Sequence, residues 1–325
     1  MTKHILFSYV FDKHGKAHKL NDKEVAKELR TEDEMVTWVH LDANKKESKK
    51  WLEKEVNYLD HLIIDALIVE ETRPRVIEFE NGLLLILRGV NLNKNAEPED
   101  MVSIRMWIDA ERIITVQRRD MTAVSNIRDQ IEAGKLIKNS GEFLYNLLYQ
   151  ILHITSPFLY ALTEKIDELE EKILVTHDIK FREELLQIRK QSTIFKRYLV
   201  PQEEAIAQLR ILDHVWIGDW TKRHFQENLD HVAHMIEEVD EVRDRSQILH
   251  DELANALTAK LNKSMHKLSI IASIFMPITF FTSVFSMNIG GIPGIGNDAA
   301  FNLIMTAIVM LTTLQLWFFK RKDLL

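Results

Sequence analysis

Residues 268–287 read LSIIASIFMPITFFTSVFSM and residues 299–319 read AAFNLIMTAIVMLTTLQLWFF, and neither stretch contains a charged side chain. A helix of about 20 residues covers the roughly 30 Å of a bilayer's hydrocarbon core. One such stretch is compatible with the buried helix of a soluble protein, but a closely spaced pair is hard to explain that way. We therefore expect transmembrane helices at residues 268–287 and 299–319.

The charges that flank these stretches predict their orientation. Three lysines between residues 260 and 267 precede the first stretch, and Lys320, Arg321 and Lys322 follow the second. The intervening loop, residues 288–298, contains neither lysine nor arginine. Because basic residues favour the cytoplasmic side, we expect both ends of the chain in the cytoplasm, with residues 320–325 as a basic tail and the loop outside.

The composition excludes several classes of protein. A formal net charge of -7 argues against nucleic acid as the main partner, because phosphate binding needs a basic face. The chain has no cysteine, so a metal ion must be bound by carboxylate, imidazole, amide, carbonyl or water ligands, which suit an ion in passage. The sequence has neither a glycine-rich phosphate loop before a helix nor a recognisable nucleophile–histidine–carboxylate spacing. We therefore expect no enzyme and no permanently bound cofactor.

Residues 1–120 predict a cytoplasmic α/β domain with a mixed sheet. Runs rich in β-branched and aromatic residues are expected as strands, and the last two runs contain a turn: ILFSYVF, WVHLDA, VIEFENGLLLILRGVNL and MVSIRMWIDAERIITVQ. Asp22–Glu55 and Tyr58–Val69 are expected to be helical. Residues 121–220 predict a cytoplasmic helical region, in which Ser156-Pro157 interrupts one long helix and Val200-Pro201 ends or bends another.

One very long helix is predicted from Thr221 into the first apolar stretch, because this segment has neither glycine nor proline before Pro277. At ~1.5 Å per residue it extends on the order of 90–100 Å, and residues 221–267 form its stalk. Helices of this length rarely stand alone, so we expect it to pack in a bundle or a coiled coil.

A stripe of small and polar residues follows one face of this helix. Steps of three and four residues back from the loop give the candidate pore-lining residues: Asn288, Met287, Ser286, Ser283, Thr279, Met276, Ala272, Ser269, Met265, Asn262, Thr258, Asn255 and Asp251. Polar groups are costly in hydrocarbon unless they face partners or water. Copies of the helix around a symmetry axis would line a channel. Hydroxyls that bond to their own helix, or lie at helix contacts, would give the same pattern.

Below the apolar stretch the same face becomes acidic. Its residues are expected to form a cytoplasmic funnel that concentrates cations: Asp244, Glu241, Glu237, His234, Asp230 and Glu227. His231 and His234 lie three residues apart, with Glu227 and Glu238 near the same face, so His231, His234 and Glu227 could hold zinc in transit. The simpler explanation, a solvated helix surface, stays open.

The loop after the first apolar stretch, residues 286–294, reads SMNIGGIPG. It resembles the signature of the CorA superfamily of metal ion transporters, in which Gly-Met-Asn ends the first of two C-terminal spans. Asn-Ile-Gly-Gly-Ile-Pro is similar to the ZntB-type zinc-transporter branch. Likeness to that branch extends over most of the chain: ETRPR at 71–75, LLILRGVNLN at 84–93, MVSIRMW at 101–107 and the pair Arg118-Arg119.

This resemblance implies a CorA-like, funnel-shaped homopentamer in the lipid bilayer of a bacterial inner membrane. Asn288 would form a ring at the outer pore mouth and bind a hydrated metal ion, Zn²⁺ being the implied cargo and protons the implied coupling ion. Two residues depart from the family pattern. Ser286 replaces the glycine of the signature, and Gly294 stands where magnesium-transporting relatives often carry glutamate, which favours zinc. A Mg²⁺/Co²⁺ channel of the CorA type and a membrane-anchored helical scaffold without transport remain the alternatives.

Overall fold

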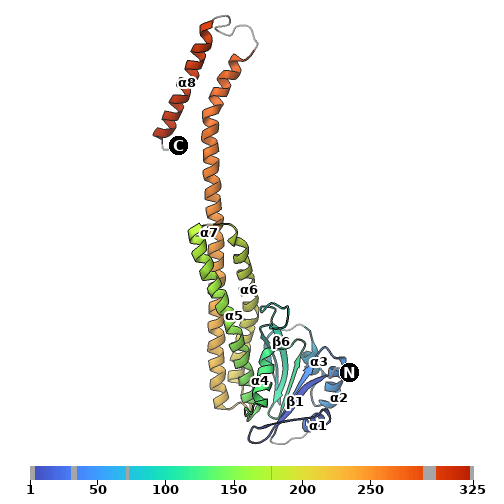
Figure 1. Cartoon of the computed structure of the whole chain (residues 1–325). Helices are drawn as coiled ribbons and strands as arrows, with labels where there is room; N and C mark the ends of the chain where they lie inside the picture. The colour runs from blue at the N-terminus through green and yellow to red at the C-terminus, as the bar shows by residue number, and fades with distance from the viewer. Residues whose placement is uncertain (1–3, 31–34, 71–72, 177, 288–297, 323–325) are drawn as a thin grey trace. The chain divides into compact units, whose positions relative to one another are not determined.

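The computed structural model describes residues 4–30, 35–70, 73–176, 178–287 and 298–322. The chain divides into two compact units, one formed by Met1–Thr176 with Lys180–Leu249 and the other by His177–Ile179 with His250–Leu325. The first unit contains a sheet with helices on both faces, followed by long helices (Figure 1). The second contains the apolar C-terminal part of the longest helix and one further apolar helix.

A seven-stranded mixed sheet forms the centre of the first unit, in the order β2-β1-β3-β7-β6-β5-β4. Its strands are β1 Ile5–Phe11, β2 Ala17–Lys19, β3 Val36–Asp42, β4 Arg75–Phe79, β5 Gly82–Gly89, β6 Val102–Asp109 and β7 Arg112–Gln117. Neighbouring strands are antiparallel except β3 and β7, which are parallel. This arrangement confirms the predicted α/β region with a mixed sheet.

Three short helices cover one face of the sheet: α1 Asp22–Glu28, α2 Lys46–Glu55 and α3 His61–Ile68. Leu52 of α2 and Leu67 of α3 share a fully buried core with Val116 of β7. The predicted helical span Asp22–Glu55 is wrong in its middle, where β3 confirms the strand predicted from WVHLDA. The β-branched and aromatic run that begins at Val36 pairs with both β1 and β7, and this pairing overrides the helix-forming residues around it.

The other face of the sheet packs against α4 Thr122–Glu132, α5 Ser140–Thr176 and α6 Phe181–Ile211 (Figure 1). The Trp38 ring of β3, for example, meets the ring of Phe143 edge-on at 4.8 Å. α5 and α6 continue through Pro157 and Pro201, so the predicted helix interruption at Ser156-Pro157 is wrong. A proline removes one backbone hydrogen bond, but the buried face of α5 continues on both sides of it and holds the helix.

The longest helix, α7, covers Asp219–Phe285 in 67 residues and confirms the predicted long helix. Its buried residues within the first unit recur every three or four positions and include Phe225, Val232, Met235, Val239, Val242 and Leu249. In the second unit, α7 is accompanied by α8, Asp298–Arg321. Phe281 and Phe285 of α7 line an apolar groove of about 320 Å³ together with Leu303 and Ile308 of α8. Within the described residues, α7 and α8 are the helices long and apolar enough to cross a membrane.

Candidate ion pathway

The acidic row of α7 lies on its exposed side in the first unit. Every residue of the row is exposed: Glu227, Asp230, His234, Glu237, Glu241 and Asp244. The opposite side of the same turns is buried, because Val232, Met235, Val239 and Val242 are each at most 2% exposed. The helical period therefore separates a packed side from a side that the rest of the chain leaves open.

Part of the negative charge on this row is compensated by neighbouring arginines. Arg243 Nη2 lies 2.9 Å from the Asp244 carboxylate, and Arg245 Nη1 lies 3.6 Å from Glu241. Arg245 is shared with α5, where it also pairs with Asp167 and Glu170. The row is consequently less negative than its carboxylates alone suggest, and these exposed pairs are screened by solvent.

The candidate zinc residues have other partners within one chain. His231 Nε2 lies 3.0 Å from the Ser156 hydroxyl of α5, and burial, followed by the nearby His153 and His234, lowers the pKa of His231. His234 Nδ1 lies 3.8 Å from Glu238. The part of the chain that the structure describes holds no group of three His, Asp or Glu side chains able to bind a metal ion. Metal binding by Glu227, His231 and His234 would need ligands from another copy of the chain, and it stays a prediction.

The upper part of the stripe lies on α7 in the second unit. Its described members are all exposed: Asp251, Asn255, Thr258, Asn262, Met265, Ser269, Ala272, Met276, Thr279, Ser283, Ser286 and Met287. Most other residues after Leu253 are exposed as well, so exposure alone does not distinguish this face. The stripe is compatible with a surface that other copies of the chain cover, or that lines a water-filled space between copies.

Several hydroxyls of the stripe bond to their own helix. Thr258, Thr279 and Ser286 donate to the carbonyl oxygens four residues earlier, at 2.9, 2.9 and 2.8 Å. Such a bond uses the single hydroxyl proton and leaves the oxygen free to accept a hydrogen bond. These side chains can therefore accept hydrogen bonds from water, including water around a cation.

Asn288, the predicted ring residue, and the rest of the signature loop to residue 297 lie outside the described residues. The structure does place Ser286 and Met287 directly after the last residue of α7, Phe285, and immediately before that loop. The geometry around Asn288 remains a prediction from the sequence.

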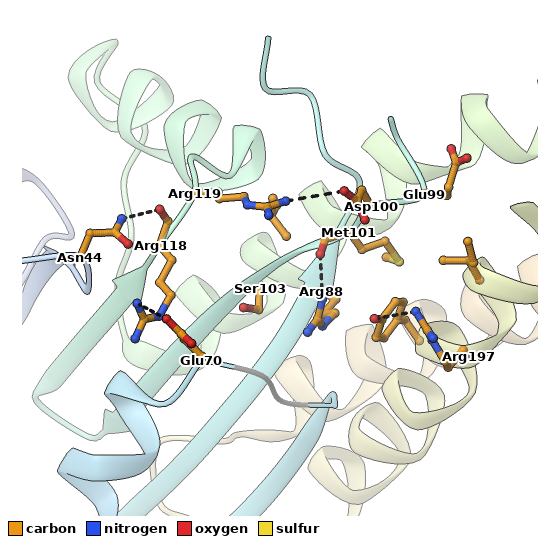
Figure 2. A pocket seen from close by; sticks show the side chains of 13 residues that line it. Asn44, Glu70, Arg88, Glu99, Asp100, Met101, Ser103, Arg118, Arg119 and Arg197 are labelled. Atoms are coloured by element: carbon orange, nitrogen blue, oxygen red, sulfur yellow. Dashed lines mark hydrogen bonds and ion pairs between the residues drawn. The ribbon is translucent and has the colours of Figure 1, made fainter. Parts of the chain in front are cut away.

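A pocket of about 570 Å³ lies in the first unit, at residues for which the sequence predicted no role (Figure 2). It is lined by arginines and acids from several segments, together with a few neutral residues: Asn44, Glu70, Arg88, Glu99, Asp100, Met101, Val102, Ser103, Arg118, Arg119, Ile194, Arg197 and Tyr198. In the sequence, only the family likeness of LLILRGVNLN and Arg118-Arg119 pointed to the segments that form this pocket. These segments are too far apart in the chain to predict a common pocket.

Comparison with known proteins gives a consistent assignment. Residues 33–321 match the family model described as CorA-like Mg²⁺ transporter protein. The chain is 31% identical to the divalent cation transporter CmaX of Pseudomonas aeruginosa, over 98% of this chain and 96% of that protein. It is 32% identical to the zinc transport protein ZntB of Pectobacterium carotovorum, over 97% and 94% of the two chains. The structure of full-length CmaX matches with a TM-score of 0.83 and 30% identity, covering 98% of this chain and 97% of that one.

Proposed function

This chain belongs to the CorA-like Mg²⁺ transporter family, and from that premise we propose that it transports divalent cations, chiefly Zn²⁺, along the axis of a homopentamer. In this assembly the side of α7 that carries the polar stripe from Asp251 to Ser283 faces the axis, and Asn288 follows in the loop. Both ends of the chain lie in the cytoplasm of a bacterial cell, and the two apolar helices cross its inner membrane. The divalent ion is the cargo and no permanent cofactor is required.

The observation that carries the proposal is the exposure of the acidic row on α7, from Glu227 to Asp244, opposite a fully packed side. In a single chain, a continuous polar row that runs into an apolar segment would have no function. Repeated around an axis, the row becomes a negatively charged vestibule that raises the local concentration of cations. The hydroxyls of Thr279, Ser283 and Ser286 follow it at the same helical spacing and supply acceptors for a hydrated ion.

Zinc is favoured over magnesium by the loop and by the relatives. Gly294 stands after the loop proline, where magnesium-transporting relatives often carry glutamate, and Asp298 is the only acid in residues 288–298. A relative at 32% identity is named a zinc transport protein. The family model is named for Mg²⁺, so a Mg²⁺/Co²⁺ channel is the second candidate. Proton coupling is proposed on the family likeness alone.

The test is ion uptake by the purified protein in liposomes that contain a zinc-sensitive dye. We expect Zn²⁺ entry above that of protein-free liposomes, modest inhibition by excess Mg²⁺, and a change in rate when a pH gradient is imposed. Preferential uptake of Mg²⁺ would establish the CorA-type channel instead. If no divalent ion entered, the chain would be a membrane-anchored scaffold and the proposal would be wrong.

A further inference from the structure

The lysines that precede the first apolar stretch lie on one side of α7. Lys260, Lys263 and Lys267 recur at intervals of three and four residues, so the helical period places them in one row. All three are exposed. Met265 of the polar stripe lies two residues from Lys263 and from Lys267, which is about 200° around the helix. The lysine row and the polar stripe therefore lie on opposite sides of α7.

The lysine row continues into the side of α7 that faces α8. From Lys267, steps of three or four residues pass three isoleucines and reach Phe281 and Phe285. The first isoleucine, Ile270, is only 9% exposed, and the other two are half-buried. Both phenylalanines line the apolar groove that α7 shares with α8. The three lysines consequently point to the side of α7 on which α8 lies.

The basic end of α8 lies level with this row. At ~1.5 Å per residue, Lys267 precedes Phe281 by about 20 Å along α7, and Arg321 follows Ile308 by about 20 Å along α8. Phe281 and Ile308 line the same groove, and a chain that turns back after α7 and returns through this groove runs antiparallel to it. The row is therefore joined by three more exposed basic residues: Lys320, Arg321 and Lys322.

These six residues form a basic cluster that carboxylates do not compensate. Residues 253–297 contain neither aspartate nor glutamate, and Asp323 is the only acid after Asp298. Among the described residues, none of the six forms a salt bridge. Arg243 and Arg245, further back on α7, each pair with carboxylates. The positive charge of the basic cluster therefore needs a negative partner from outside the chain.

The apolar stretches set the depth of the basic cluster in a membrane. Lys267 directly precedes the first stretch, and Lys260 lies about 10 Å further from it along the helix. The headgroup layer on each side of the hydrocarbon core is roughly 5–8 Å thick. The exposed Trp317, whose ring centroid lies 5.2 Å from the Arg321 guanidinium carbon, is typical of the same interface. The basic cluster thus lies at the depth of lipid phosphates.

We propose that the basic cluster binds the headgroup of an anionic phospholipid of the cytoplasmic leaflet, whose acyl chains lie along the outward side of α7 and α8. Clusters of lysine and arginine next to a membrane helix attract acidic headgroups. An acidic protein would match the charge as well, but the apolar surface that begins directly after Lys267 favours a ligand with acyl chains.

The outward direction of the basic cluster rests on the proposed function, in which the polar stripe faces the axis. Lysines on the opposite side then face the lipid. If they lined the axis instead, their charges would repel a divalent cation. An anionic headgroup also reduces the repulsion that the basic ends of several copies exert on one another and on the cargo.

The test is native mass spectrometry of the full-length protein, titrated in detergent with phosphatidylglycerol or with phosphatidylcholine of the same acyl chains. The two lipids share the phosphate, but the choline of the second cancels its charge. We expect a Kd for phosphatidylglycerol at least about tenfold lower than for phosphatidylcholine, because each nearby basic residue favours an acidic headgroup by about fivefold. Equal Kd values for the two lipids would overturn the proposal.

Two double variants locate the site on both helices. Lys263→Gln/Lys267→Gln on α7 and Lys320→Gln/Lys322→Gln at the end of α8 should each raise the Kd for phosphatidylglycerol by about tenfold or more. The Kd for phosphatidylcholine should stay the same. All four lysines are exposed, so the packing of the helices is kept. An unchanged Kd for phosphatidylglycerol in either variant would contradict a site shared by the two helices.

Lys46→Gln/Lys50→Gln is the matched control, since these exposed lysines lie four residues apart on α2, in the first unit. The control should bind phosphatidylglycerol like the wild type, and an equal loss in the control would overturn the proposal. The measurement requires no transport. Selective lipid binding without ion uptake would refute only the proposed function, and Zn²⁺ uptake without selective lipid binding would refute only the lipid site.

Discussion

The ammonium group of Lys196 on α6 lies 2.7 and 2.6 Å from the two carboxylate oxygens of Asp240 on α7. Asp240 immediately precedes Glu241, which belongs to the exposed acidic row. Adjacent acids on α7 therefore serve different purposes: Asp240 attaches the helix to α6, while Glu241 lies on the open side. The pair fixes the rotation of α7 about its axis, and hence the direction in which the row faces.

We expect Asp240→Asn to lower the thermal midpoint of the full-length protein in detergent. Both side chains are about one-third exposed, so solvent screening limits the coupling with Lys196→Met to about 0.5–1 kcal/mol. A double-mutant cycle on the thermal midpoints, with the enthalpy from calorimetry, measures this coupling. The exposed pair Lys172–Glu168 provides the control and should give a smaller value. A coupling no larger than in that control pair would contradict the role of Asp240.

Gly82, at the start of β5, is expected to tolerate no larger residue. A Cβ atom there would lie 2.7 Å from the Ile108 carbonyl oxygen and 2.7 Å from a ring carbon of Trp107. Because one of these neighbours is backbone, Gly82→Ala should destabilise the protein by about 1–3 kcal/mol. Gly218→Ala is the control, since no atom lies within 4 Å of its added Cβ. Equal thermal midpoints for the two variants would refute this account of the hairpin.

His40 on β3 is buried in a polar network. The Thr115 hydroxyl donates to Val39 O at 3.1 Å and accepts from Trp38 Nε1 at 2.8 Å. The contact of 2.8 Å between His40 Nδ1 and this same hydroxyl then requires a proton on Nδ1. Burial is the main reason that the pKa of His40 is lowered to about 4. The ring is neutral in the folded protein at neutral pH.

This lowered pKa predicts a loss of stability in mild acid. An unfolded histidine has a pKa of about 6.5, so below that pH the unfolded chain takes up a proton that the folded chain excludes. The free energy of unfolding should fall by up to about 1.4 kcal/mol per pH unit as the pH drops from about 6.5 to 4. His40→Gln should reduce the difference between thermal midpoints at pH 7.5 and pH 5. The control His14→Gln, at an exposed position, should show the same difference between the two midpoints as the wild type. An unchanged difference in His40→Gln would contradict this account.

The main elements of the fold follow from local patterns in the sequence. The absence of glycine and proline between Thr221 and Pro277 predicted α7, and the turns near Gly82 and Ala110 predicted two hairpins. Strand β2 has three residues, too few for an alternating pattern. β3 was predicted as a strand from the run WVHLDA, but the helical span predicted around it was too long, and the pairing of β3 with β1 and β7 shows where that span is interrupted.

The candidate sites differ in how far the sequence predicts them. The acidic row of α7 lies on one helix, so the 3.6-residue period alone brings its members together. The arginine pocket joins Arg88, Arg118 and Arg197 from β5, the end of β7 and α6. Its formation depends on strand order and on the packing of α6, which no local pattern reports. A single sequence predicts the pathway better than the pocket.

Asn288→Ala should reduce Zn²⁺ uptake by reconstituted protein to the level of protein-free liposomes. In the proposed pentamer an amide ring binds the water shell of the entering ion, which alanine cannot replace. The size of the assembly, measured by light scattering in detergent, should not change. Asn302→Ala is the control, because Asn302 is an exposed amide on α8. Undiminished uptake by Asn288→Ala would remove Asn288 from the pathway.

The hydroxyls of Thr279 and Ser283 provide the most direct test of the stripe within the apolar part of α7. Valine is close in size to threonine but accepts no hydrogen bond, so Thr279→Val/Ser283→Val would remove two rings of acceptors from a pentamer. At about 1 kcal/mol for each hydrogen bond to water, Zn²⁺ uptake should fall by about tenfold or more, with the protein still assembled.

The control for this variant is Thr306→Val/Thr313→Val on α8, where both hydroxyls are exposed and bond to carbonyls four residues earlier at 2.7 Å, as Thr279 does at 2.9 Å. The control variant also loses two hydroxyls, but from α8, which does not face the axis in the proposed pentamer. Its Zn²⁺ uptake should therefore match that of the wild type. Equal losses in the two variants would mean that the hydroxyls act only in helix packing. Unchanged uptake in both would mean that the ion does not pass along this face of α7.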